Sequence, residues 1–160
     1  EVSLVNAMSR ETVLRQYLDT VKGQYSHILI DCQPSLGMLT VNALAAADSV
    51  LIPVQCEYYA LEGIADLMTT IKLTKKRLNP SLEIQGIVLT MYDSRTNFSE
   101  QVAAEVEKFF GTSVYKTRIP RNVRIAEAPS HGEPVIKYDR ISKGSRAYLH
   151  LADEFLRREE

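Results

Sequence analysis

The clearest candidate for chemistry is an aspartate, Asp31, which closes an apolar run and precedes a loop with proline and glycine. The run reads HILIDC over residues 27–32, and the loop reads QPSLG over residues 33–37. An aspartate at the carboxyl end of a buried strand can hold Mg²⁺, usually through water, beside nucleotide phosphates, as in a Walker B segment. The alternative is that Asp31 only caps the turn or helix that follows.

Polar residues also follow two other apolar runs. Glu57 comes shortly after residues 49–54 and could act as a general base. We favour a simpler interpretation, an acid in the first turn of a helix, because the helix dipole stabilises it there. Asp93 and Arg95 follow residues 83–92 and suit either the rim of a ligand site or an ordinary loop.

Charge is unevenly distributed along the chain. The 160 residues carry 19 basic and 20 acidic side chains, for a net charge of −1. Residues 116–146 hold eight basic and three acidic side chains, so this stretch carries +5 and the other 129 residues carry −6. Such asymmetry suits a phosphate-rich partner, and a solvated face with ordinary ion pairs explains it equally well.

The composition, with 45% hydrophobic and 24% charged residues, is that of a globular protein. No apolar stretch reaches the ~18 residues of a membrane span. Cys32 and Cys56 lie too far apart for a metal-binding motif, so we expect free, buried thiols in a reducing cytoplasm. None of the seven glycines has the spacing of a P-loop or a dinucleotide-binding fingerprint, and no catalytic triad is recognisable, so we assign no catalytic residue.

The apolar patterns predict the elements that would position these residues. Near-continuous runs predict parallel strands at residues 27–32, 49–54 and 83–92, with weaker candidates at 2–6, 113–119 and 134–138. Helical periodicity predicts helices at residues 10–21, 39–47, 59–78, 99–110 and 142–157. Alternating strands and helices imply an α/β fold, a mostly parallel doubly wound sheet with helices on both faces. We expect residues 1–160 to form a single domain.

Three segments together resemble one protein family. They read IDCQPSLGMLTVNALAAADSVLIPVQCEYYALEG, LTMYDSRTNFSEQV and IPRNVRIAEAPSHGEPVIKYD. In this order they resemble the C-terminal two-thirds of the ParA/Soj chromosome- and plasmid-partitioning ATPases, of the MinD/ParA type. The resemblance implies a deviant P-loop ATPase that uses ATP and Mg²⁺, dimerises with ATP bound and binds DNA without sequence specificity. It also implies a ParB/Spo0J-like partner that stimulates hydrolysis and releases the DNA.

The resemblance assigns roles to individual residues. Asp31 matches the Walker B aspartate that holds Mg²⁺ through water. The region that surrounds adenine is matched by Met91, Pro120, Arg121 and Asn122. The positions that match those implicated in DNA binding are Arg95 and Arg124, together with Lys143 and Arg146 in a variably used basic stretch.

Two departures from the family pattern bear on activity. Gln33 stands where the family usually has proline, in a switch loop whose mobility is therefore expected to differ. The Gly-rich Walker A segment with its lysines, and the aspartate that positions the attacking water, have no counterpart in these 160 residues. Because stabilisation of the phosphates dominates phosphoryl transfer, we expect this chain alone to be inactive as an ATPase.

The alternative function is a non-catalytic module that keeps the fold and binds DNA or a full-length ATPase. An uncovered sheet edge would favour self-association, so we expect a homodimer or another homo-oligomer. The last residues, HLADEFLRREE, end acidic rather than basic, so we predict no membrane partner. The beginning of the chain has no signal-peptide pattern, so the expected location is the bacterial cytoplasm, in association with the nucleoid.

Overall fold

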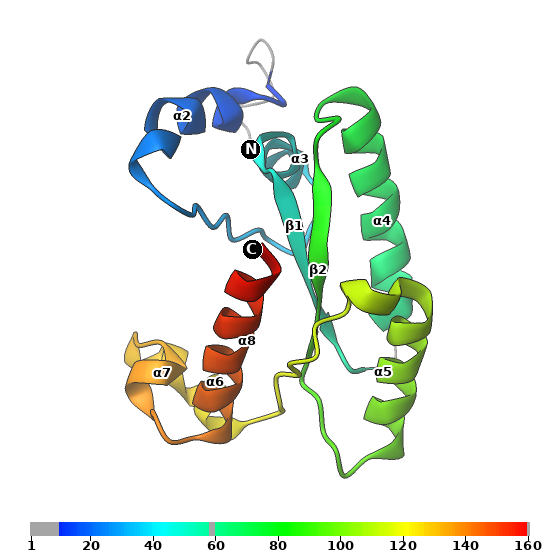
Figure 1. Ribbon diagram of the computed structural model, residues 1–160, viewed down its shortest axis with the longest axis vertical. Helices are drawn as coiled ribbons and strands as arrows, with labels where there is room; N and C mark the ends of the chain where they lie inside the picture. Colours follow the sequence, from blue (N-terminus) through cyan, green and yellow to red (C-terminus); the bar gives the residue numbers. More distant parts are fainter. Residues whose placement is uncertain (1–9, 58–59, 160) are drawn as a thin grey trace. The chain divides into compact units, whose positions relative to one another are not determined.

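A computed structural model describes residues 10–57 and 60–159 (Figure 1). The chain divides into two compact units. The first comprises Glu1–Val50 and Gly63–Gln85, and the second comprises Leu51–Glu62 and Gly86–Glu160.

Two strands form a parallel sheet, β1 (Ser49–Gln55) and β2 (Glu83–Thr90). At its beginning, Glu83 N–H donates to Asp48 O at 3.0 Å. At its end, Cys56 N–H donates to Thr90 O at 2.9 Å, so the residue numbers rise together along both strands. In a parallel pair the carboxyl ends meet at one edge, which places the residues after β1 beside those after β2.

The first unit contains the helices α2 (Val13–Val21), α3 (Met38–Ala46) and most of α4 (Ala60–Arg77). Buried Asn42 joins the first two helices, since its amide donates to Arg10 O at 2.7 Å and accepts from Leu14 N–H at 3.3 Å. Buried Asn79, just after α4, donates to Leu44 O and Ala47 O at 3.0 and 2.7 Å. These amides satisfy backbone groups that helix ends leave without partners.

The second unit contains the longer helices α5 (Asn97–Phe110) and α8 (Lys143–Glu159), which lie on opposite sides of the strands (Figure 1). Between them come the short helices α6 (Val123–Glu127) and α7 (Val135–Tyr138). The core on the α8 side consists of Val88, Tyr115 and Ile119, against which pack Ile125, Ala147, Leu151 and Phe155. Gly111 ends α5 with a φ of 53°, a backbone conformation that favours glycine.

An extended segment follows α5 and runs beside β2 without forming a regular strand. Tyr115 N–H donates to Ile87 O and Ile119 N–H donates to Leu89 O, both at 2.8 Å. From the first hydrogen bond to the second, this segment advances four positions and β2 advances two, so the segment bulges between them. The N–H groups of Lys116 and Thr117 in the bulge donate instead to the carboxylate of Glu154 on α8, each at 2.8 Å.

The predicted α/β class, with parallel strands and interspersed helices, is confirmed. So are the strands at 49–54 and 83–92 and all five helices, with small shifts of their ends. The strand at 113–119 is wrong as a regular strand, because the Thr117 N–H, which a ladder with β2 would use, donates to Glu154 instead. The candidate strand at 2–6 lies outside the described residues.

Two further strand predictions are wrong. Residues 27–32 have no regular secondary structure, and neither of the two described strands includes them. Residues 134–138 form α7, whose β-branched Val135 is buried against α8 and whose carbonyl accepts from the Ser145 hydroxyl at 2.8 Å. Apolar runs of this length fit a buried helix as well as a strand.

Candidate functional site

A cavity of about 400 Å³ lies in the second unit, and residues that follow β1 and β2 line it. This volume is within the range of small-molecule sites, about 300–1,000 Å³. The lining residues come from three segments that are distant in the sequence: Cys56 and Glu57; Met91, Asp93, Thr96, Phe98 and Ser99; and Arg121.

Hydrogen bonds between two of these segments bring Met91 and Arg121 to the same cavity. Tyr92 N–H donates to Ile119 O at 3.1 Å, and Arg121 N–H donates to Tyr92 O at 2.9 Å. Met91 has a φ of 53°, a strained conformation for a residue with a side chain, and such strain is concentrated at functional sites. Pro120 forms a bridge with Tyr92, so it supports the wall of the cavity from the backbone.

Glu57 also lines the cavity. From the sequence we favoured an acid in the first turn of a helix and did not predict this position. Its Oε1 accepts a hydrogen bond from the Arg121 guanidinium at 2.7 Å, across 64 positions of sequence. Both side chains are about half exposed, so solvent weakens this ion pair. The signal that could have found Glu57 is its position just after a strand, at the same sheet edge as Asp93.

Asp93 and Arg95 form a two-pronged ion pair at the cavity wall. Arg95 Nε donates to Asp93 Oδ1 at 2.9 Å, and a terminal nitrogen of Arg95 donates to Oδ2 at 2.7 Å. Arg95 N–H also donates to Oδ1, at 3.0 Å. These hydrogen bonds from Arg95 lower the pKa of Asp93 to about 2. The carboxylate is therefore ionised at neutral pH, and each of its oxygens accepts at least one hydrogen bond from Arg95.

A second cluster of charges surrounds Tyr92, the neighbour in sequence of the cavity residues Met91 and Asp93. Arg118 donates to Glu100 at 3.1 Å and to Glu107 at 2.9 Å, both on α5, and its guanidinium lies 4.7 Å from the Tyr92 ring centre. The Tyr92 hydroxyl donates to Glu100, which raises the pKa of Tyr92 and lowers that of Glu100. Arg118 is thereby committed to α5 and is not free for a ligand.

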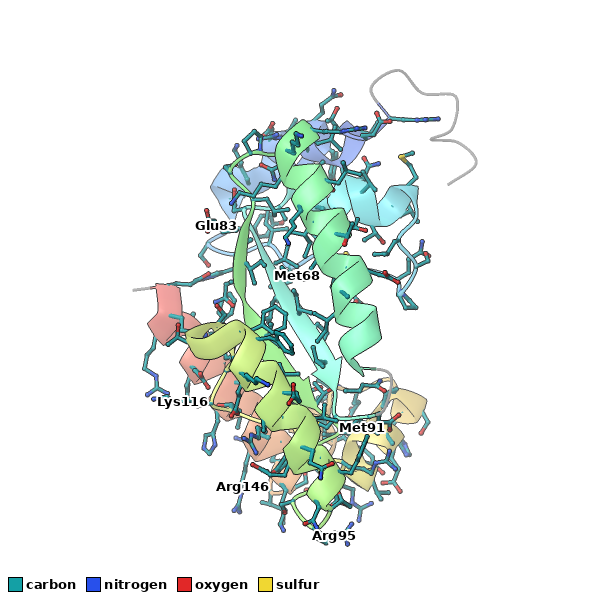
Figure 2. The ribbon with its side chains drawn as sticks, turned by 90° about the vertical axis from the view of Figure 1, so that its right-hand side faces the viewer. Met68, Glu83, Met91, Arg95, Lys116 and Arg146 are labelled. Carbon is teal, nitrogen blue, oxygen red and sulfur yellow. The ribbon has the colours of Figure 1, made fainter. Side chains whose placement is uncertain are left out.

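The basic stretch at 116–146 separates into paired and unpaired side chains. Arg118 and Arg121 form the ion pairs described above. Arg124 pairs with Glu127 and Asp139 at 2.8 and 3.3 Å, and Lys137 pairs with Glu133 at 2.7 Å. The other four basic side chains are exposed and have no ion pair within the described residues: Lys116, Arg140, Lys143 and Arg146. Lys143 and Arg146 are in the first turn of α8, and Figure 2 labels Arg146 on α8 and Lys116 beside it.

The predicted site residues have different surroundings in the structure. Met91 and Arg121 line one cavity, and Pro120 is part of its wall. Asn122 has a structural role, because its Oδ1 accepts from Arg124 N–H at 3.0 Å and so caps α6. Arg95 and Arg124 are held by acids of the same chain, whereas Lys143 and Arg146 are free of such partners among the described residues.

Asp31 is exposed and lies in a segment without regular structure. The described residues contain no group of three or more histidine, cysteine, aspartate or glutamate side chains that could hold a metal. A single carboxylate still fits Mg²⁺, which usually keeps several waters and takes its other ligands from phosphates. The loop after Asp31 is tied to α3, because the buried Thr40 hydroxyl donates to Ser35 O at 2.6 Å.

Both cysteines are free thiols, as predicted, but the prediction that both are buried is wrong for Cys32. Cys32 is exposed and Cys56 is buried, and burial raises the pKa of both. None of the helices described is both long enough and apolar enough to cross a bilayer.

Comparison with known proteins places these features in context. Residues 1–84 match the model of a family described as an AAA domain. The chain is 58% identical over 154 residues to the sporulation initiation inhibitor protein Soj of Bacillus subtilis (strain 168), covering 96% of this chain and 61% of that protein. It is 55% identical over 159 residues to the chromosome partitioning protein ParA of Myxococcus xanthus (strain DK1622), covering 99% and 56%.

A solved structure supports the fold. The cobyrinic acid a,c-diamide synthase of Mycobacterium smegmatis, solved with bound ADP and magnesium, has a TM-score of 0.79 and 35% identity, covering 98% of this chain and 57% of that one. The chain therefore spans about three-fifths of the length of the proteins it matches.

Proposed function

Because the chain belongs to the AAA domain family and is homologous over nearly its full length to Soj and ParA chromosome-partitioning proteins, we propose that it is part of a partitioning ATPase. In this proposal the 160 residues are the C-terminal part of one ATPase domain, which binds ATP with Mg²⁺ and, as a dimer, non-specific DNA. The observation that carries the proposal is the cavity, in which segments far apart in sequence bring Met91 and Arg121 together.

The cavity suits the adenine base of ATP. Met91 and Phe98 supply apolar contact, and Glu57 and Arg121 supply a hydrogen-bond acceptor and donors. A mostly apolar wall with a few placed polar groups is typical of nucleotide and other small-ligand sites. Asp31 would hold Mg²⁺ through water, and the metal would neutralise charge on the phosphates.

The unpaired cations suit the phosphates of DNA. Each phosphate that a lysine or arginine neutralises releases counterions, so binding of this kind weakens steeply with salt. Lys143 and Arg146 can bind phosphate directly, because among the described residues no acid holds them. Arg95 and Arg124 must first exchange Asp93 or Glu127 for a phosphate, which lowers their net contribution.

The proposal extends to the partners and to hydrolysis. A ParB/Spo0J-like protein is the proposed stimulator of ATP hydrolysis, and DNA as ligand makes the nucleoid the proposed site of action. No glycine-rich phosphate-binding motif occurs in these 160 residues, so we propose that by themselves they do not hydrolyse ATP. A phosphate-release assay showing steady turnover by this chain would contradict that part of the proposal.

DNA binding is tested by removing the unpaired cations. The double substitution Lys143→Gln/Arg146→Gln should weaken binding to a random-sequence duplex and reduce the salt slope by about 2, one for each phosphate contact. The matched control is Lys72→Gln/Lys76→Gln on α4, which removes the same charge from exposed lysines outside the basic stretch. Equal losses in both variants would reject a localised DNA surface.

ATP binding is tested separately, by titrating ATP into isotope-labelled protein and following the amide signals of Met91, Asp93 and Arg121. Shifts at these positions support the cavity as the base site. Salt-sensitive DNA binding with no shift at these positions would favour the second candidate function, a non-catalytic DNA-binding module.

A further inference from the structure

Two acidic residues line the cavity, Glu57 and Asp93, and arginines occupy their carboxylates to different extents. Both oxygens of Asp93 accept hydrogen bonds from Arg95. Glu57 accepts from Arg121 through Oε1 alone, and within the described residues its Oε2 accepts no hydrogen bond. Of the four carboxylate oxygens of Glu57 and Asp93, Glu57 Oε2 is thus the one that accepts no hydrogen bond within the described residues.

This difference matters for a purine base. Guanine carries an N–H and an NH₂ group side by side, a pair of donors that matches both oxygens of a free carboxylate. Adenine has no such pair on that edge, where its single amino group lies beside a ring nitrogen that accepts. A free Asp93 would thus favour guanine, whereas a single free oxygen suits the amino group of adenine.

We propose that Arg95 determines base specificity: by occupying both oxygens of Asp93, it removes the acceptor pair that would select guanine and leaves Glu57 to accept from adenine. This inference rests on the proposed use of the cavity for a nucleotide base. Arg95 acts through Asp93 and does not contact the base.

The geometry of the pair supports this role. The Asp93 side chain is 19% exposed and lines the cavity, whereas Arg95 is 86% exposed and lies outside the cavity lining. Figure 2 shows Arg95 near the beginning of α5, and Met91 farther along the same side of the second unit. The two residues are only two positions apart, and the Arg95 N–H adds a third hydrogen bond, so little chain entropy opposes the pair. The pKa of Asp93, about 2, keeps the pair ionised at neutral pH.

The test compares dissociation constants for ATP and GTP in the wild-type protein and in Arg95→Ala, with Arg95→Gln as a second variant. Because a two-pronged contact with one base discriminates by about 1–3 kcal/mol, we expect the preference for ATP over GTP to fall by about 5-fold to 150-fold. The double variant Asp93→Asn/Arg95→Ala should restore the preference, because asparagine presents a single acceptor. Lys108→Ala, which removes an ion-paired cation on α5, is the control and should leave the preference unchanged.

The outcomes separate this inference from the proposed function. If wild type binds ATP and both Arg95 variants keep its preference within threefold, the role of Arg95 is overturned while the nucleotide cavity stands. If the preference falls in Arg95→Ala but the double variant does not restore it, Asp93 is not the acceptor and the inference is also overturned. If wild type binds neither nucleotide at the cavity residues, the proposed function fails and this inference fails with it.

Discussion

Replacement of Glu154 by glutamine should destabilise the second unit. The Glu154 carboxylate accepts from the N–H groups of Lys116 and Thr117 at 2.8 Å each and from Arg158 at 2.9 Å. It is the partner that the bulged segment beside β2 uses in place of a strand ladder. A glutamine can accept through one atom only, so one backbone N–H would face an NH₂ group.

The magnitude follows from the number and kind of hydrogen bonds lost. Hydrogen bonds to a charged group contribute about 1.5–3 kcal/mol each, and the Glu154 side chain is only 15% exposed, so water replaces them poorly. Glutamine retains part of this network in neutral form. We therefore expect Glu154→Gln to lower the free energy of unfolding by about 2–3 kcal/mol.

The assay is urea unfolding of wild type, Glu154→Gln and the control Asp153→Asn. Asp153 is the neighbouring exposed acid on α8, and no hydrogen bond or ion pair of its carboxylate is present among the described residues. Amide hydrogen exchange should show protection lost at Lys116 and Thr117 in Glu154→Gln alone. The reasoning is refuted if both variants unfold within about 0.5 kcal/mol of each other, the usual scatter for surface substitutions.

Acidic pH should abolish the stabilisation that the ionised Glu154 carboxylate provides. Burial raises the pKa of Glu154, but the hydrogen bonds from Lys116 N–H and Thr117 N–H outweigh it, so the pKa is lowered overall. A carboxyl whose pKa is lowered by folding contributes its full stabilisation of the folded state at pH values above its pKa in the unfolded chain, about 4.3. This contribution is lost as the pH falls through the pKa of the folded state. The stability difference between wild type and Glu154→Gln should therefore be constant near pH 7 and shrink below about pH 4.

Two further predictions concern the backbone of β2 and the Asp93–Arg95 pair. Gly86→Ala should lower the free energy of unfolding by about 1–3 kcal/mol, because the new methyl group would overlap the Tyr115 ring and lie 2.9 Å from a backbone oxygen. Gly63→Ala in helix α4 should raise the free energy of unfolding by about 0.5–1 kcal/mol, because no atom lies within 4 Å of the new methyl group. Thermal unfolding of both variants measures this contrast, and equal effects would contradict it. The Asp93 carboxyl should titrate with a midpoint of about 2 in wild type and move up toward about 3.9 in Arg95→Ala, as followed by carbon NMR. An unchanged midpoint would mean that Arg95 does not hold Asp93 in solution.

The sequence was sufficient where a residue's role depends on its neighbours in the chain. The apolar runs at 49–54 and 83–92 and the helical periodicities predicted β1, β2 and the longer helices, because burial of both faces and a 3.6-residue period leave direct patterns. The resemblance to partitioning ATPases rested on long segments in a fixed order, and the comparisons confirmed it.

Predictions failed where a partner distant in the sequence decided the outcome. Residues 113–119 have strand composition, yet Glu154, about 40 positions later, takes the hydrogen bonds of their centre. Val135 and Ile136 are β-branched, yet Ser145 and the packing of α8 fix them in a helix. A strand is not a property of a segment alone, because its backbone groups need a neighbour.

Charge shows the same division between sequence and tertiary structure. The sequence by itself determined that residues 116–146 carry +5 and that Asp31, Met91 and the 120–122 segment match a nucleotide-binding family. Only the tertiary structure decided which of those charges are available, because ion pairs form between side chains that folding brings within about 4 Å. It neutralised Arg118 and Arg124 with acids of the same chain, left Lys143 and Arg146 without such partners among the described residues, and occupied Asp93 with Arg95 at the cavity wall.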